Sequence, residues 1–278
     1  DCSAIFNVAG PVGASGPSIE EIHDAAIRHV VDAAAPAARI VHTSSIVTVG
    51  VTADGRALHE DSPFDPWQLR IDYVRAKQRS EQTALRAARD RHVVVVNPAY
   101  LIGPDDHDKS FMGKFCLRFW HGRMPITAPG GWNVADVRDV ATGHLLAAER
   151  GPAGRRYILG GANVTLRDFL LRLAAASGYR PRWLPTLPGP ILSMVAVLAE
   201  ARAWLLGKEP FPSLAETKIT KRFGYVVSER ARAELGYRAR PLEESLRDAY
   251  LWHSRSGKIK PAGLPAWWVR ANAGADAA

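Results

Sequence analysis

The sequence predicts an α/β protein with a doubly wound parallel sheet and a smaller, mainly helical C-terminal part. Two patterns support this prediction. Short apolar runs alternate with helix-forming segments through about the first 160 residues, and Val93–Val96 is a continuous run, as in a parallel strand buried on both faces. Beyond that point, prolines divide the chain into segments that we interpret as helices.

Composition limits the classes of function. The chain has 278 residues, 47% of them hydrophobic and 23% charged, which is ordinary for a globular protein with a sizeable core. Its net charge is +8, but the basic residues are dispersed among acidic ones and no nucleic-acid motif accompanies them. We therefore expect a small-molecule substrate and no nucleic acid, and we interpret the charge as a solvated basic surface. An anionic substrate or cofactor phosphate is the alternative role for the charge.

Cys2 and Cys116 give neither a disulfide framework nor a metal-ligand spacing, so we expect no metal and a reducing, cytoplasmic location. No signal peptide is recognisable at the start. The most apolar stretch, Pro190–Leu206, is interrupted by Glu200 and Arg202, and its uninterrupted core is too short to span a bilayer. We expect an amphipathic or buried helix there rather than a transmembrane segment, with a membrane-surface helix as the alternative.

The first predicted unit is a strand over residues 3–10 that runs into a loop rich in glycine and proline, followed by a helix to about Ala35. Ser18 and Glu21 have the spacing of a capping box at the start of this helix. One stripe of the helix should face the sheet, and it consists of Ile19, Ile22, Ala26, Ile27, Val30 and Val31.

The second predicted strand, Arg39–Thr43, ends in hydroxyl side chains. Functional groups in open α/β sheets gather at the carboxyl ends of the strands. This strand is therefore a candidate to deliver a hydroxyl to a site, and its three candidates are Thr43, Ser44 and Ser45.

The helix over about residues 72–89 places Tyr73 and Lys77 four residues apart and hence on one face. A free tyrosine has a pKa of about 10 and is a weak acid at neutral pH. A neighbouring ammonium favours the phenolate, so we predict that Lys77 lowers the pKa of Tyr73 and brings proton transfer within reach. An exposed helix face could show the same spacing; the preceding strand with its hydroxyls favours the chemical interpretation.

With these residues the sequence resembles the extended short-chain dehydrogenases/reductases, also called NAD-dependent epimerases/dehydratases. The resemblance extends from Asp1 to about Trp252, and residues 122–125 and 156–161 are most similar to the branch of dihydroflavonol-reductase-like proteins and hopanoid-associated sugar epimerases. It implies a Rossmann-like fold that binds NAD or NADP. The matching segments are Thr43-Ser44-Ser45 with Gly50, Tyr73-Val74-Arg75-Ala76-Lys77, Asn97-Pro98-Ala99-Tyr100-Leu101-Ile102-Gly103-Pro104, Val137-Arg138-Asp139-Val140-Ala141 and Glu234-Leu235-Gly236-Tyr237.

The resemblance also implies roles for single residues. Ser45 would hydrogen-bond the substrate carbonyl or hydroxyl, with Ser44 as the alternative; Ser45 is favoured because it precedes Gly50 by five residues, the usual register of the family. Tyr73 would give or take the proton, and Lys77 would hold the nicotinamide ribose. The other implied cofactor contacts are Ala9, Gly10, Thr43, Ser44, Pro98, Ala99 and Leu101.

No glycine-rich phosphate loop of the form G-x-x-G-x-x-G occurs in a first strand–helix turn. Gly10, Gly13 and Gly16 imitate one, but they follow the strand that corresponds to the family's fourth, and Pro11 removes an amide donor. We expect roughly 60 further residues of the fold in a longer gene product, which would leave the first strand here as an apolar sheet edge. The alternative is a natural protein that has lost normal dinucleotide binding. The residues that choose between NAD and NADP would follow a strand that this sequence lacks.

We assign residues 1–104 and 130–160 to the dinucleotide-binding part, 105–129 and 161–257 to the substrate-binding part, and 258–278 to a tail. In the family the segment 105–129 covers the substrate. Its phenylalanines share a helical face and are predicted to pack in the core. The candidate substrate contacts are Tyr100 and two cations that could meet an anionic group, Lys114 and Arg118.

Three further residues are expected to have structural roles. We predict that Asp139 caps the helix that begins beside it, and that His144 on this helix is structural rather than catalytic. Thr165 is predicted to cap a helix over residues 166–176 that Gly178 ends.

Three hypotheses for function follow. The first is an NAD(P)-dependent reductase or dehydrogenase of an apolar ketone or secondary alcohol. The second is a nucleotide-sugar epimerase that retains its cofactor, and the third is a non-catalytic binding or regulatory protein of the same fold. A homodimer is a further expectation.

Overall fold

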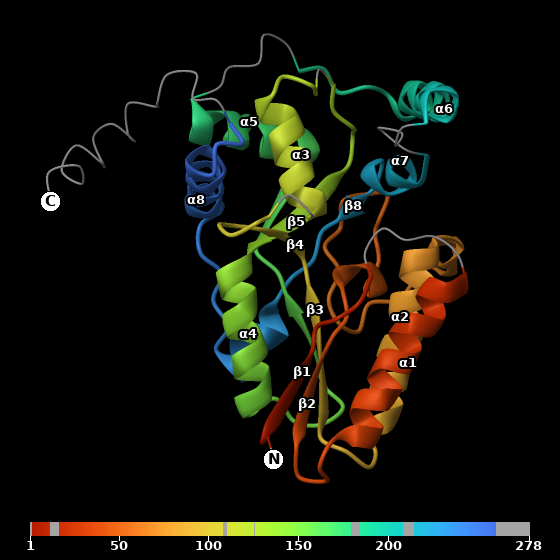
Figure 1. Ribbon diagram of the computed structural model, residues 1–278, viewed down its shortest axis with the longest axis vertical. Coiled ribbons are helices and arrows are strands. Elements are labelled where there is room, and N and C mark those ends of the chain that lie inside the picture. Colours follow the sequence, from red (N-terminus) through yellow and green to blue (C-terminus); the bar gives the residue numbers. More distant parts are fainter. Residues whose placement is uncertain are drawn as a thin grey trace, which may run out of the picture.

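A parallel sheet forms the lower half of the protein in the computed structural model, which describes residues 2–11, 17–107, 110–124, 126–178, 184–207 and 214–259 (Figure 1). The strand order is β1-β2-β3-β6, and each neighbouring pair is parallel. Every residue of β3 is buried, as predicted for a strand covered on both faces. The predicted α/β class is therefore confirmed. The strands are β1 (Ala4–Asn7), β2 (Arg39–Thr43), β3 (Val93–Pro98) and β6 (Arg156–Leu159).

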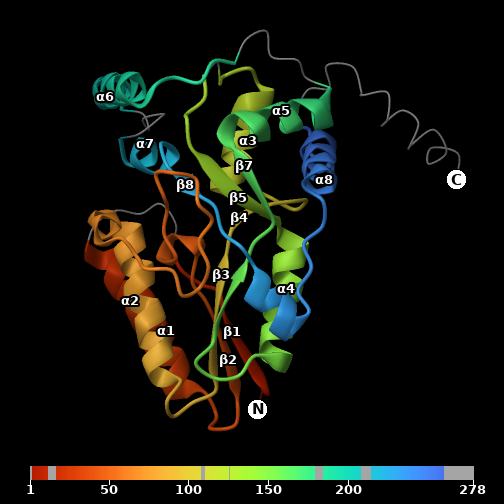
Figure 2. The same cartoon turned by 180° about the vertical axis from the view of Figure 1, so that it is seen from behind.

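Helices cover both faces of this sheet. α1 (Pro17–Ala33) and α2 (Asp72–Ala87) lie side by side on one face, and α4 (Val137–Arg150) lies on the other (Figures 1 and 2). The core between α1, α2 and the sheet is aliphatic, and its fully buried members include Ile27, Ile40 and Val95. Apolar burial of this kind contributes about 1.5–3 kcal/mol for each large side chain and dominates the attachment of the helices.

The stripe of α1 that faces the sheet differs from the prediction at one place. Ile22 was predicted to be buried but is 51% exposed, and His23 and Asp24 are buried instead. Both polar side chains have hydrogen-bond partners that offset the cost of burial: His23 Nε2 lies 3.0 Å from the carbonyl oxygen of Pro11, and Asp24 accepts from the Thr83 hydroxyl at 2.6 Å. Specific polar contacts therefore override the apolar periodicity here.

β1 is an edge strand that pairs with β2 alone among the described strands. Two of the apolar side chains in and beside it are exposed, Phe6 at 38% and Val8 at 59%. The apolar edge expected from the sequence is thus present. The loop 12–16, with Gly13 and Gly16, lies outside the described residues, as do the side chain of Ser18 and most of the predicted tail.

A second, smaller sheet lies beyond the carboxyl ends of the first. Its order is β4-β5-β7, with β8 paired to β5, and it combines parallel and antiparallel pairs. Residues 131–136, which we assigned to the dinucleotide-binding part, pair within this second sheet. Its strands are β4 (Tyr100–Ile102), β5 (Gly131–Asp136), β7 (Ala162–Thr165) and β8 (Phe223–Gly224).

Helices surround the second sheet. α3 (Phe111–Trp120), α5 (Leu166–Ser177) and α8 (Leu242–Arg255) contribute to a core with many aromatic members, among them Phe119, Trp132 and Phe169. The predicted core role of the α3 phenylalanines is thus confirmed for Phe115 and Phe119, which are 8% and 1% exposed. The remaining elements are the short helices η1 (Ile46–Thr48), η2 (Pro66–Arg70), α7 (Leu214–Thr220) and the π-helix η3 (Ala231–Leu235).

Two predicted helix caps can be compared with the structure. Thr165 caps α5 as predicted, with its hydroxyl accepting from the backbone N–H of Asp168 at 3.0 Å, and Gly178 ends the helix at φ 72°. The cap of α4 is Asp136, whose carboxylate accepts from the N–H of Arg138 at 2.8 Å. The prediction of Asp139 was wrong because Asp139 lies in the first turn and pairs with an arginine of a distant segment.

The apolar stretch forms one long helix, α6 (Gly189–Leu206). By length and composition alone it could cross a membrane, and 17% of it is buried. The expectation of an amphipathic or buried helix is therefore wrong. Apolar side chains lie on every side of the helix, and only a few of them, such as Leu192 and Ala196, are covered by the rest of the described chain.

Candidate active site

The carboxyl end of β2 turns directly into the site. Ser45 follows the strand in extended conformation, and its hydroxyl caps η1 by accepting from the backbone N–H of Val47 at 3.3 Å. Gly50 ends this turn at φ +114°, and a Cβ there would lie 3.0 Å from the amide nitrogen of Gln68. The turn therefore needs glycine, and its geometry fixes where the Ser45 hydroxyl points.

The start of α2 brings the tyrosine to this serine. Tyr73 is half-buried, and its phenol lies near the Ser45 side chain, which favours the ionised form of the phenol. Ion pairs of Arg75 and Arg79 with Glu20 of α1, both at 2.9 Å, tie the first turns of the helix to its neighbour. These arginines are partly exposed, so each pair adds no more than about 1 kcal/mol but helps to set the direction of the helix.

The pKa of Tyr73 differs from the prediction. We expected Lys77 to lower it, but burial raises it above its ordinary value, and the nearby Ser45 side chain opposes this rise only in part. Removing the phenol from water disfavours the phenolate more than its neighbours favour it. The phenol is therefore held in its protonated form at neutral pH.

Lys77 lies one turn beyond Tyr73 and is only 6% exposed. Its ammonium donates to the carbonyl oxygen of Thr43 at 3.1 Å, at the end of β2. Burial lowers the pKa of Lys77 to about 8, and the carboxylate of Glu81 partly offsets this effect. A buried cation at the carboxyl ends of the strands is thus part of the site, as the sequence indicated.

A buried polar network lies beneath the site. The Glu81 carboxylate receives hydrogen bonds from the Thr48 hydroxyl and the Asn97 amide, both at 2.7 Å, and pairs with Arg156 at 3.1 Å. The Asn97 amide also donates to the Ser45 carbonyl oxygen at 3.2 Å. The network therefore holds the Ser45 turn to α2 and to β6.

Sequence reasoning missed this network. Glu81 looked like an ordinary helix former, although it follows Tyr73 and Lys77 at the same interval of four residues. That interval places all three side chains on one face of α2. It is the signal from which the position of Glu81 at the site could have been predicted. At 2% exposure, the Glu81 side chain cannot be a surface residue of an amphipathic helix.

The other hydroxyls at the end of β2 point elsewhere. Ser44 is 4% exposed, and its hydroxyl lies 3.4 Å from that of Thr48, inside the network. The Thr43 hydroxyl lies 2.9 Å from Nε2 of His144, whose Nδ1 is 2.8 Å from the carbonyl oxygen of Val140. His144 therefore supports the strand end from α4. Of the three predicted hydroxyls, the structure brings only that of Ser45 to Tyr73.

Two histidines extend the site toward β1. The ring of His23 makes an edge contact with that of Tyr73, at 6.2 Å between centroids. Nδ1 of His42 accepts from the side-chain amide of Asn7 at 3.1 Å, and burial and the nearby Lys77 charge lower the pKa of His42 to about 3. Both imidazoles are therefore neutral, and neither was singled out from the sequence.

The predicted cofactor contacts lie where the strands of the first sheet end. Ala9 and Gly10 follow β1 and are exposed, Thr43 ends β2, and Pro98 and Ala99 stand at the end of β3. A Cβ at residue 10 would lie 2.3 Å from the ring of His23, so this position accepts only glycine without rearrangement. Leu101 lies further away along the chain, in β4 of the second sheet.

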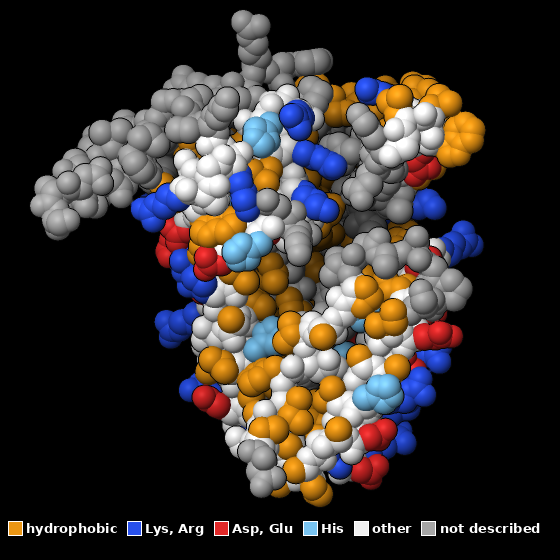
Figure 3. Space-filling view, in the orientation of Figure 1, with side chains coloured by type: hydrophobic (Ala, Val, Ile, Leu, Met, Phe, Trp, Pro, Cys, Tyr) orange, Lys and Arg blue, Asp and Glu red, His pale blue; other side chains and the backbone are white. Residues whose placement is uncertain are grey.

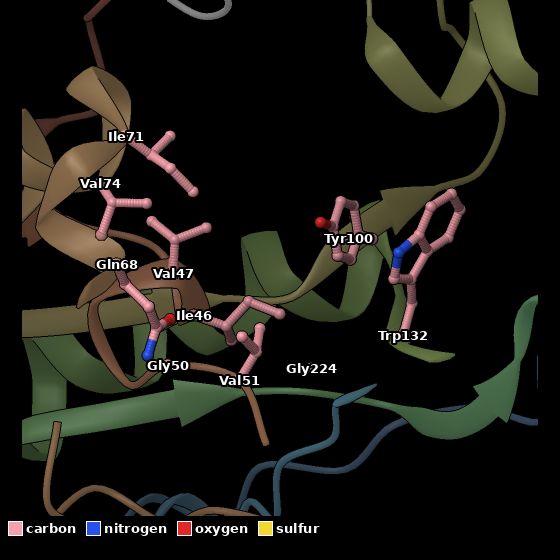
Figure 4. A pocket seen from close by; sticks show the side chains of 10 residues that line it. All are labelled: Ile46, Val47, Gly50, Val51, Gln68, Ile71, Val74, Tyr100, Trp132 and Gly224. Atoms are coloured by element: carbon pink, nitrogen blue, oxygen red, sulfur yellow. The ribbon is translucent and has the colours of Figure 1, made fainter. Parts of the chain in front are cut away.

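A small apolar cleft adjoins the Ser45–Tyr73 pair. It has a volume of about 20 Å³, enough for about one water molecule. Ile46 and Val47 follow Ser45 in the chain, Val74 follows Tyr73, and Tyr100 faces these side chains from the other side (Figure 4). Tyr100 stacks on Trp132 at 4.8 Å between ring centroids. The predicted substrate contact Tyr100 thus lies beside the site. The cleft is lined by Ile46, Val47, Gly50, Val51, Gln68, Ile71, Val74, Tyr100, Trp132 and Gly224.

A second cavity, of about 270 Å³, lies on the far side of Trp132, between α3, α5 and α6. Its walls are mainly aromatic and aliphatic, and the charged residue among the lining residues is Arg123. The predicted substrate contacts Lys114 and Arg118 stand on α3 but are not among its lining residues, so the structure does not bring them to this cavity. The described lining consists of Phe111, Phe115, Arg123, Met124, Ile126, Thr127, Ala128, Trp132, Leu166, Leu170, Leu192, Val195 and Thr220.

The residues present fit one end of a dinucleotide. A buried ammonium and a phenol at the carboxyl ends of parallel strands suit a nicotinamide riboside, and Nε2 of His42 is a buried polar atom without a hydrogen-bond partner in the described part of the chain. Among the described residues, none forms a glycine-rich cradle for the pyrophosphate. The fit is therefore to the nicotinamide end.

Comparisons with known proteins agree with this geometry. Residues 1–160 match the model of the NAD dependent epimerase/dehydratase family. The chain is 34% identical over 234 residues to a Synechocystis protein named "Putative dihydroflavonol 4-reductase", covering 80% of this chain and 66% of that one. It is 33% identical over 233 residues to "Sterol demethylase protein B" of Methylococcus capsulatus, covering 80% and 68%. The matched part spans about two thirds of the length of these two relatives.

Solved structures show the same fold. The crystal structure of gox2253 superposes with a TM-score of 0.78 at 30% identity, covering 93% of this chain and 80% of that one. The dTDP-glucose 4,6-dehydratase of Bacillus anthracis in complex with NAD gives a TM-score of 0.70 at 13% identity, covering 92% and 74%, a likeness of fold alone. The matched family model, these relatives and the strand-end site together show that the chain belongs to the NAD-dependent epimerase/dehydratase family.

Proposed function

We propose that the protein is an NAD(P)-dependent oxidoreductase that interconverts an apolar ketone and a secondary alcohol. The observation that supports this most directly is the proximity of Ser45 and Tyr73 beside an apolar cleft, with the buried Lys77 one turn along the same helix face. The apolar walls on both sides of Trp132 favour an apolar substrate body, because they offer few partners to the hydroxyls of a sugar. The same fold also supports a nucleotide-sugar epimerase, which the experiment below distinguishes.

In the reduction direction, the phenol of Tyr73 donates its proton to the carbonyl oxygen while the Ser45 hydroxyl donates a hydrogen bond to the same oxygen. A nicotinamide held at this site would supply the hydride for the new carbon–hydrogen bond. Burial raises the pKa of Tyr73 and so keeps the phenol protonated and ready to act as an acid. The Lys77 ammonium, one turn further along α2, would hold the ribose of the nicotinamide end of the cofactor.

The test is to measure turnover of a panel of apolar ketones with NADH and with NADPH on the whole protein. We expect Tyr73→Phe to lower turnover about 100- to 10,000-fold, the usual contribution of a positioned acid, while cofactor affinity stays similar. Tyr225→Phe is the matched control, because it removes a phenol hydroxyl from a half-buried tyrosine that is not among the residues placed at the site, and its turnover should stay near that of the wild type.

Retained turnover in Tyr73→Phe would remove Tyr73 from the acid role. Conversion of a nucleotide sugar with no net change in NADH, and with cofactor that copurifies, would instead identify an epimerase. Cofactor binding without turnover of either substrate class would favour a binding protein.

A further inference from the structure

α6 carries an apolar surface that the rest of the described chain leaves uncovered. Four side chains show this most clearly: Met194 is 59% exposed, Leu198 64%, Trp204 84% and Leu205 73%. By length and composition alone, the helix is apolar enough to cross a membrane. Contiguous exposed apolar surface in a folded protein marks a site of interaction.

The opposite side of α6 is held by the protein. Leu192 and Val195 line the 270 Å³ cavity, and the side chain of Ser193 accepts a hydrogen bond from the ammonium of Lys221 at 2.6 Å. The carboxylate of Glu200 accepts from the backbone N–H of Leu214, at the start of α7, at 2.8 Å. These contacts attach α6 to the rest of the described chain, and the helix stands at the upper right edge of the molecule (Figure 1).

The described charged side chains of α6 and the neighbouring segments are mostly basic. Over residues 110–124, 184–207 and 214–222, the described side chains include a single acidic one, Glu200, and it is engaged with α7. The space-filling view shows apolar side chains over α6 and Lys and Arg gathered over the neighbouring α3 (Figure 3). The basic residues of these segments are Lys114, Arg118, Arg123, Arg202, Lys218, Lys221 and Arg222.

We propose that α6 docks the protein on the surface of an anionic phospholipid bilayer. Its outer leucines and Met194 enter the acyl region, and Trp204 sits at the level of the headgroups. The exposed cations Lys114, Arg202 and Lys218 face the lipid phosphates. An apolar helix face rimmed by cations matches this partner in both its parts, because acyl chains take up the apolar side chains and each nearby cation gains from the negative surface.

This arrangement leaves one helix between the bilayer and the apolar cavity, since the inner side of α6 is a wall of that cavity. For the reaction proposed above, an apolar substrate dissolved in the membrane lies next to the cavity that receives it. The docking itself does not depend on that reaction, and it is measured without substrate.

The experiment is co-sedimentation of the whole protein with vesicles of phosphatidylcholine alone and with vesicles in which phosphatidylglycerol supplies an anionic surface. We expect binding to the anionic vesicles that weakens with salt, and much weaker binding to phosphatidylcholine alone. The double variant Leu198→Ser/Leu205→Ser should weaken binding about 10-fold or more. The matched control Leu145→Ser/Leu171→Ser changes two exposed leucines on α4 and α5 and should bind like the wild type.

A second measurement does not depend on the stability of the leucine variants. Brominated acyl chains should quench part of the tryptophan fluorescence of the wild type, and this part should be missing in Trp204→Phe. No vesicle binding by the wild type overturns the proposal. Equal loss in the control pair also overturns it, because general apolar adhesion would then explain binding. A dimer in solution that Leu198→Ser/Leu205→Ser converts to a monomer, with no binding to vesicles, would assign the surface to a second copy and overturn the proposal too.

Discussion

The two halves of the molecule hold their ligand-facing residues by different physical means. At the carboxyl ends of the first sheet, a buried polar network with Glu81 and Asn97 fixes the turn that carries Ser45. Around the second sheet, the cavity beyond Trp132 is walled by apolar side chains of α3, α5 and α6. Hydrogen bonds are directional and apolar packing is not. For the proposed function, this difference means that the first half sets the geometry of the chemistry, whereas the second sets the shape and polarity of what can bind.

The sharpest test of this contrast is Lys77→Met. It removes the buried charge of the first half but keeps an unbranched side chain, so we expect turnover to fall about 1,000-fold, or about 4 kcal/mol, and NAD(P) affinity to fall with it. Stability at pH 7 should not decrease, because burial lowers the pKa of Lys77 to about 8 and the charged form is therefore disfavoured in the fold. Kinetics, cofactor titration and thermal unfolding measure the three effects, with Lys258→Met as the control. Unchanged cofactor affinity would count against a ribose contact.

Loss of the buried polar network around Glu81 should lower the free energy of unfolding. Glu81→Leu leaves Arg156 without its carboxylate and Asn97 and Thr48 without an acceptor, and removing one partner of a buried ion pair costs about 3 kcal/mol or more. Denaturant unfolding measures this loss. The control Glu243→Leu removes a carboxylate that is 62% exposed and paired at the surface, where the cost is below about 1 kcal/mol. Similar losses in both variants would mean that the network does not hold the site.

The pH dependence of stability should follow His42. Its pKa falls from an ordinary 6.5 to about 3 in the fold, so below pH 6.5 the unfolded chain binds a proton that the folded chain does not, and stability declines as the pH falls. Between pH 6.5 and pH 5 this amounts to about 2 kcal/mol. His42→Gln, which can still accept from Asn7, should flatten this decline, whereas His29→Gln on the exposed side of α1 should not. Denaturant unfolding at several pH values decides between these outcomes.

The smallest expected effect concerns the apolar half. Val195→Thr adds one hydroxyl to the cavity wall without a change in shape, and we expect the KM for an apolar ketone to rise a few-fold, about 1 kcal/mol, with kcat unchanged. Val31→Thr makes the same change on α1 of the other half and should leave KM unchanged. A fall in kcat rather than a rise in KM would show that the second half affects the chemical step and not only substrate binding.

Local patterns were sufficient for much of the fold. Val93–Val96 and the strand that ends at Thr43 were recognisable because parallel strands buried on both faces need continuous apolar runs. Tyr73 and Lys77 were found by their helical interval, and Thr165 and Gly178 by cap chemistry. In each case, residues close in the chain determine the feature.

The features that could not be predicted depend on partners far along the chain. Asp136 rather than Asp139 caps α4, because Asp139 is paired with Arg240. Ile22 is exposed because His23 and Asp24 find buried partners. Such contacts join segments whose separation in sequence leaves no periodic signal.

The sequence by itself determined the fold class, the family and the presence of a tyrosine, a lysine and a hydroxyl at the ends of the strands. Only the tertiary structure decided that Ser45, and not Ser44 or Thr43, meets the phenol, and that Glu81 lies beneath them. It also decided that burial raises the pKa of Tyr73 where a neighbouring charge was expected to lower it. The reason is that hydrogen-bond partners and exclusion from water are properties of the assembled layers, and no single segment carries them.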